Sequence, residues 1–77
     1  PYFSPLSSPD EKQVAFLRLE EDGWYLAIED ESGDQIAGQG PIYAEQMLEW
    51  DCNEDSDKLS ARFISGEQEF WIHLELP

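Results

Sequence analysis

On both sides of an Asp22-Gly23 pair, every second position is apolar: Ala15, Leu17 and Leu19 before the pair, and Trp24, Leu26 and Ile28 after it. A period of two indicates a strand that buries one face, and an Asp-Gly pair is typical of a two-residue hairpin turn. Pairing outward from this turn predicts the apolar cross-strand pairs Leu19 with Leu26 and Leu17 with Ile28. We therefore expect a hairpin with one apolar face.

A second alternating stretch surrounds Gly66-Glu67 near the C-terminus. Glycine at the first central position suits a type II′ hairpin turn. Pairing outward predicts three apolar cross-strand pairs, namely Phe63 with Phe70, Ala61 with Ile72 and Leu59 with Leu74. This segment is expected to be a second hairpin, again with one apolar face.

The segment between the two hairpins is predicted to contain a short strand and a helix. Gly33 suits the left-handed position of a three-residue turn, which starts a strand near Gln35 to Gln39 and places Ile28 beside Ile36. Gly40-Pro41 then favours a helix start. Apolar residues follow at helical spacing and predict one buried stripe: Tyr43, Ala44, Met47, Leu48 and Trp50.

The predicted element order is β-β-β-α-β-β. We expect an α+β fold, with a single antiparallel sheet of about five strands and one short helix packed on one face. Residues 1–9 are rich in proline and serine and predict an extended arm, and residues 10–77 form a single acidic domain.

The charge of the chain narrows the classes of partner. The formal net charge is −14 over 77 residues, which repels nucleic acid phosphates and anionic membranes. Cys52 is the single cysteine, so no intramolecular disulfide is possible, and the N-terminal residues lack the basic and apolar regions of a signal peptide. We expect a cytoplasmic protein that binds neither nucleic acid nor membranes directly.

Candidate catalytic and metal-binding residues are few. The chain has one histidine, and Cys52 lies among carboxylates that oppose its thiolate form. Residues 51–57 place Asp or Asn at alternate positions as a calcium loop does, but Ser56 replaces the turn glycine and Arg62 replaces the bidentate glutamate. No motif for phosphate, dinucleotide or zinc occurs. We expect no catalytic residues, cofactor or metal.

One short helix can cover only one face of the predicted sheet, so the other face is the candidate binding surface. The hairpin registers place aromatic and cationic side chains there, with Arg62 opposite Trp71. Two alternatives remain open: the arm, with Tyr2, Phe3 and Leu6, folds over this face, or two copies pair through it. The candidate residues of this face are Phe16, Tyr25, Arg62, Trp71 and His73.

These patterns favour a small acidic, non-enzymatic binding module or inhibitor that engages a basic protein, with carboxylates that imitate nucleic acid phosphates. The loop residues expected to steer the partner are Asp51, Glu54, Asp55 and Asp57. The alternative is a soluble domain whose acidity is only a solubility or salt adaptation and whose aromatic face mediates homodimerisation. The oligomeric state expected is a monomer or a weak homodimer.

Overall fold

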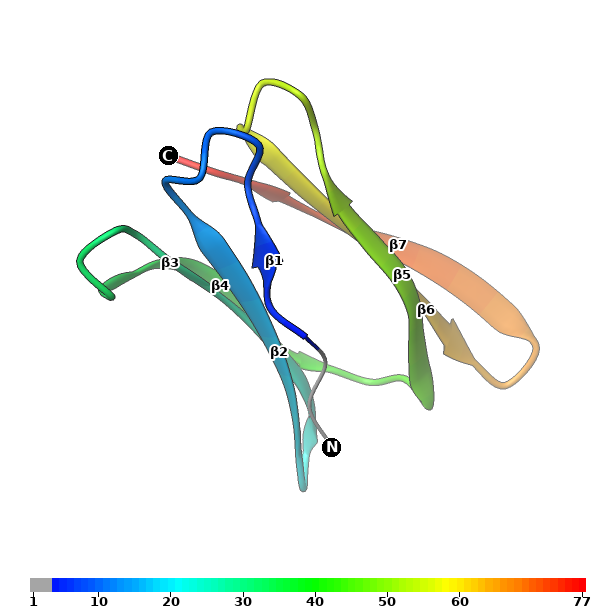
Figure 1. The fold of residues 1–77 in the computed structure, drawn as a ribbon. Helices are drawn as coiled ribbons and strands as arrows, with labels where there is room; N and C mark the ends of the chain where they lie inside the picture. The colour runs from blue at the N-terminus through cyan, green and yellow to red at the C-terminus, as the bar shows by residue number, and fades with distance from the viewer. Residues whose placement is uncertain (1–3) are drawn as a thin grey trace.

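The computed structural model describes residues 4–77, and this part of the chain consists of strands joined by turns and loops (Figure 1). It contains no helix, and so none that is long and apolar enough to cross a membrane. The strands are β1 (Leu6–Ser7), β2 (Val14–Glu20), β3 (Gly23–Glu29), β4 (Gln35–Ile42), β5 (Gln46–Cys52), β6 (Lys58–Ser65) and β7 (Gln68–Glu75).

The strands form two antiparallel sheets that face each other (Figure 1). The first sheet has the order β1-β2-β3-β4 and the second the order β5-β6-β7. The segment between β4 and β5 passes from one sheet to the other, so the N-terminal hairpin and the C-terminal hairpin belong to different layers. The expected α+β fold with a single sheet is therefore wrong, and the fold is an all-β sandwich.

The hydrophobic core lies between the two sheets, where each contributes its apolar face. Phe63 and Ala61 of β6 are completely buried, and the Trp24 ring of β3 lies 6.4 Å from the Phe63 ring. The Trp24 indole also donates a hydrogen bond to the Ala44 carbonyl, at 3.0 Å. The other buried core residues are Ala15, Leu17, Leu26, Ile28, Ile42, Met47 and Leu59.

A bulge in β5 explains why the helix prediction is wrong. Met47 pairs with Phe63 and Glu49 with Arg62, which leaves Leu48 as an extra residue. The extra residue brings Met47 and Trp50, three positions apart, to the same inward side of a strand. A bulged strand thus reproduces the spacing of apolar residues that is typical of a helix.

The two hairpin predictions differ in accuracy. In the C-terminal hairpin all three predicted apolar pairs are confirmed, about the turn at Gly66-Glu67. In the N-terminal hairpin the apolar face is as predicted, but the pairing is displaced by two residues, because the turn residues are Glu21 and Asp22. The observed pairs are Leu19 with Trp24, Leu17 with Leu26 and Ala15 with Ile28.

Gly23 accounts for the displaced turn. Its φ is +142°, and a Cβ atom there would lie 2.9 Å from the Ile42 carbonyl oxygen of the neighbouring strand β4. The close approach of β4 therefore requires glycine at this position, whereas the prediction assigned it to the turn. Irregularity in β4 also changes the third strand: Ile28 pairs with Ala37, and Ile36 lies in a bulge.

The N-terminal segment is tied to the sandwich. Leu6 and Ser7 pair with β2 as the short strand β1, and Leu6 packs against the core between the sheets. Tyr2 and Phe3, which we considered as a cover for an outer face, lie outside the described residues.

Candidate binding site

The sandwich divides the aromatic face that the sequence predicts. Phe16 and Tyr25 lie on the outward side of the first sheet, while Arg62, Trp71 and His73 lie on the outward side of the second. Because the sheets are stacked on their apolar faces, these two outward sides point away from each other (Figure 1). The expectation of one continuous surface is wrong, and the two faces are separate candidates.

On the second sheet, two rows of side chains cross the three strands; we call their residues the β5–β7 outer face. In the first row Glu49 is opposite Arg62, and Arg62 is opposite Trp71. The Arg62 guanidinium lies 3.3 Å from the Glu49 carboxylate and 6.0 Å from the Trp71 ring centroid, and it also contacts Glu69. The second row is Asp51, Ser60 and His73.

The second row forms the floor of an open groove of about 420 Å³. The Ser60 hydroxyl lies 2.8 Å from Nδ1 of His73, and the His73 ring lies parallel to the Trp71 ring with 6.0 Å between centroids. Trp71 remains 48% exposed. The groove therefore combines an indole that is available to a partner with carboxylates on its border: it is lined by Glu49, Asp51, Asn53, Ser60, Trp71 and His73.

The electrostatic balance of the β5–β7 outer face is negative. The hydrogen bond with Glu49, followed by the charges of Glu49 and Glu69, raises the pKa of the Arg62 guanidinium. Arg62 therefore stays charged and is surrounded by two carboxylates, while Asp51 in the adjacent row has no cation opposite it. A cationic partner meets excess carboxylate beside Trp71, which is the environment that favours a cation–π contact.

The acidic loop after β5 is organised by Asn53. Its side-chain oxygen accepts hydrogen bonds from the backbone N–H groups of Asp57 and Lys58, at 3.0 and 2.9 Å, and its amide contacts the Asp57 carboxylate. Glu54 and Asp55 are exposed at the tip. Across residues 4–77 no three His, Cys, Asp or Glu side chains are grouped so as to hold a metal ion. Asn53 also lines the groove, so the loop presents its carboxylates at one end of the groove.

The outward side of the first sheet is already occupied by its own contacts. The Tyr25 ring lies so close to Gly40 that a Cβ there would be 2.3 Å from a ring carbon, and the Arg18 guanidinium lies 5.4 Å from the ring centroid. The Tyr25 hydroxyl donates a 2.7 Å hydrogen bond to Asp22, which raises the pKa of Tyr25. Tyr25 covers glycine backbone there, so Phe16, which is 37% exposed, is the more exposed of the two predicted aromatic residues on this face.

The row of Asp51, Ser60 and His73 contains the residue types of a hydrolytic triad in a different order. In a triad the histidine lies between the nucleophile and the carboxylate that orients it. Here Ser60 lies in the centre, with Asp51 and His73 on opposite sides. The carboxylate is therefore placed next to the hydroxyl and not next to the imidazole, which does not orient a general base.

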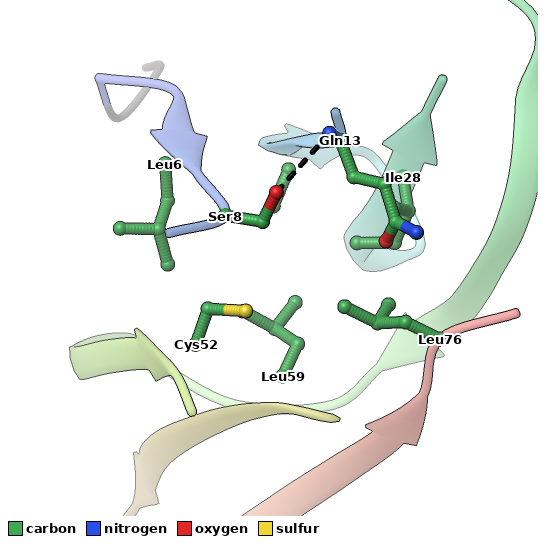
Figure 2. A pocket seen from close by; sticks show the side chains of 8 residues that line it. Leu6, Ser8, Gln13, Ile28, Cys52, Leu59 and Leu76 are labelled. Carbon is green, nitrogen blue, oxygen red and sulfur yellow. Dashed lines mark hydrogen bonds between the residues drawn. The ribbon is translucent and has the colours of Figure 1, made fainter. Parts of the chain in front are cut away.

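A small hollow at one end of the sandwich is lined mostly by apolar side chains, and Cys52 is one of them (Figure 2). It lies between the two layers, where Leu6 and Ile28 face Leu59 and Leu76 (Figure 2). Burial, with the nearby charges of Asp51, Asp10 and Asp57, raises the pKa of the Cys52 thiol. A raised pKa disfavours the nucleophilic thiolate. The hollow has a volume of only about 10 Å³, so it is a packing feature of the core.

Three groove residues were not among the site residues predicted from the sequence. Glu49 was hidden in the predicted helix, and Asn53 was considered only as part of a calcium loop. Ser60 could have been found, because the correctly predicted C-terminal hairpin places it opposite His73. Comparison of the chain with protein-family models, with curated proteins and with solved structures yields no match.

Proposed function

We propose that this protein is a non-enzymatic binding module, of the kind that can act as an inhibitor, and that it engages a basic protein through the β5–β7 outer face. A cytoplasmic location, inferred from the single cysteine, belongs to the same proposal. The acidic chain attracts a cationic partner and accelerates its encounter. The residues around Trp71 then provide the specific contacts.

The observation that carries the proposal is the exposed Trp71 within an acidic groove. Tryptophan is enriched among the residues that contribute most to binding, and at 48% exposure it keeps much of its surface for a partner. A Lys or Arg side chain placed over the indole is within reach of Glu49 and Asp51, which line the same groove. Charge and aromatic contact therefore act on the same cationic group.

The alternative function, homodimerisation through one aromatic face with acidity as a salt adaptation, is less well supported. The aromatic residues that it requires lie on two opposite sides of the sandwich. Two copies that meet through the β5–β7 outer face also bring their carboxylates together, and each chain carries a formal net charge of −14.

Affinity purification tests the proposed function. The immobilised protein is expected to retain a specific basic protein from lysate in about 50 mM salt and to release most of it in 500 mM salt, because screening weakens contacts between charges. The variant Trp71→Ala is expected to retain much less of that protein, while the matched variant Phe16→Ala on the opposite face retains as much as the wild type. Recovery of no basic protein at low salt contradicts the proposal.

A further inference from the structure

The four edges of the two sheets differ in how well they are protected from another strand. Strand β1 is only two residues long, β4 contains Pro41 and two register shifts, and β5 is interrupted by the bulge at Leu48. Short strands, prolines and bulges are the usual devices that prevent edge pairing. Strand β7 has none of them: its eight residues pair with β6 without a register shift.

The hairpin register shows which backbone groups of β7 point away from β6. A two-residue turn at Gly66-Glu67 makes the flanking pair, Ser65 with Gln68, a hydrogen-bonded pair, and such pairs alternate along the ladder. The pairs of Trp71 with Arg62 and of His73 with Ser60 are therefore the non-bonded ones. Their N–H and C=O groups point toward the free edge, where within residues 4–77 no strand pairs with β7.

The inward side chains of β7 leave apolar surface at the same edge. Phe70, Ile72 and Leu74 are only partly buried, whereas their partners on β6 are almost completely buried. Because β6 covers them on one side and the core lies beneath, their exposed part faces the free edge. A strand added there can bury this surface with its own apolar side chains.

We infer that the edge of β7 is the site where an extended basic segment of the partner protein adds as a further strand of the second sheet. This inference rests on the proposed function and specifies the form of the partner. The added strand alternates Lys or Arg, on the outward side near Glu69, Trp71 and Glu75, with apolar residues that contact Phe70 and Ile72. Main-chain hydrogen bonds supply affinity, and the alternation supplies specificity.

A second copy of β7 fits this edge less well than a basic segment does. When the two strands overlap over residues 69–75 about a two-fold axis, Glu69 of one chain is opposite Glu75 of the other at both ends. Like charges directly opposite destabilise a strand pair, whereas Lys or Arg at these positions stabilises it. Charge complementarity therefore selects a basic partner.

A labelled ten-residue peptide of alternating Lys and Val tests the inference by fluorescence anisotropy. Its affinity is compared for the wild type, His73→Ala and His73→Pro. Both variants lose the imidazole, but only proline removes the outward N–H, and proline is tolerated where that group faces away from the ladder. We expect His73→Pro to bind about five- to tenfold more weakly than His73→Ala, the matched reference that already lacks the imidazole.

A control peptide and a second measurement separate the possible failures. A block peptide of five Lys followed by five Val has the same charge, and equal affinity for both peptides overturns strand addition while leaving basic recognition intact. Equal affinity of the alternating peptide for His73→Ala and His73→Pro also overturns strand addition and leaves basic recognition intact. If neither peptide binds, the edge site is overturned. The proposed function also fails if the affinity purification recovers no basic protein.

Amide hydrogen exchange of the wild type is expected to slow at Trp71 and His73 with saturating alternating peptide. Unchanged exchange rates contradict the inference even if His73→Pro does not fold.

Discussion

Replacing Phe63 with alanine is expected to lower the free energy of unfolding by about 3–5 kcal/mol, the usual cost of deleting a buried phenyl ring. Phe63 is completely buried, and its ring is stacked with that of Phe70 at 5.9 Å. A domain of this length has a total stability of about 4–12 kcal/mol, so the variant is expected to be close to unfolding. Urea denaturation followed by tryptophan fluorescence measures the difference.

The matched control for Phe63→Ala is Trp71→Ala, an even larger truncation on the other face of the same hairpin. Trp71 is about half exposed, and its main contacts are with the surface residues Arg62 and His73. We expect this change to lower the free energy of unfolding by less than about 1 kcal/mol. Equal losses for the two variants would contradict the assignment of inward and outward faces.

Replacing Gly23 with alanine is expected to lower the free energy of unfolding by at least about 2 kcal/mol. A side chain is strained at φ +142°, and the added Cβ would also meet the backbone of Ile42 in β4. Ile42 is held by its pairing with Trp24 of β3, so its backbone cannot move away as readily as a flexible side chain can. Thermal or urea denaturation by circular dichroism measures the loss.

Gly33→Ala separates the two causes of the Gly23 effect. Gly33 also has a positive φ, +85°, but no atom lies within 4 Å of the position its Cβ would take. This variant carries only the conformational strain, for which about 1 kcal/mol is expected. A Gly33→Ala loss as large as that of Gly23→Ala would show that the close approach of β4 contributes nothing.

The two hairpins show which parts of this fold the sequence can predict. The C-terminal hairpin was predicted in full because Gly66 has the positive φ that its turn requires and no other contact competes for it. In the N-terminal hairpin the same type of signal was misleading, because the glycine at position 23 is required by packing against β4. A displacement by two residues preserves the alternation, so the buried face was still predicted correctly.

The division into two sheets could not be predicted in the same way. It depends on β5, where the bulge at Leu48 gives a strand the apolar spacing of a helix. Once a helix is assumed to cover the apolar face of one sheet, both hairpins are placed in that sheet and their outward faces are merged. The candidate site was therefore predicted as too large a set, in which Phe16 and Tyr25 belong to the opposite side of the molecule.

Some residues of the predicted site do lie together in the structure. Arg62 opposite Trp71 followed from the correct register, and His73 and Asp51 meet at the groove that Trp71 borders. Glu49 joined them only when residues 46–52 were seen as a strand, because alternation then places Glu49 and Asp51 outward. Acidic composition alone could not have selected these carboxylates among the 18 acidic residues of the chain.

The central claim is that a basic partner binds at the second sheet, and titration of the ¹⁵N-labelled protein with the alternating Lys-Val peptide tests it most directly. Chemical shifts are recorded for every backbone amide and for the tryptophan indoles. We predict saturable changes at Ser60, Trp71 and His73, including the Trp71 indole, with Phe16 and Tyr25 unchanged. Changes centred on Phe16 and Tyr25, or weak changes spread evenly over the acidic residues, would contradict the claim.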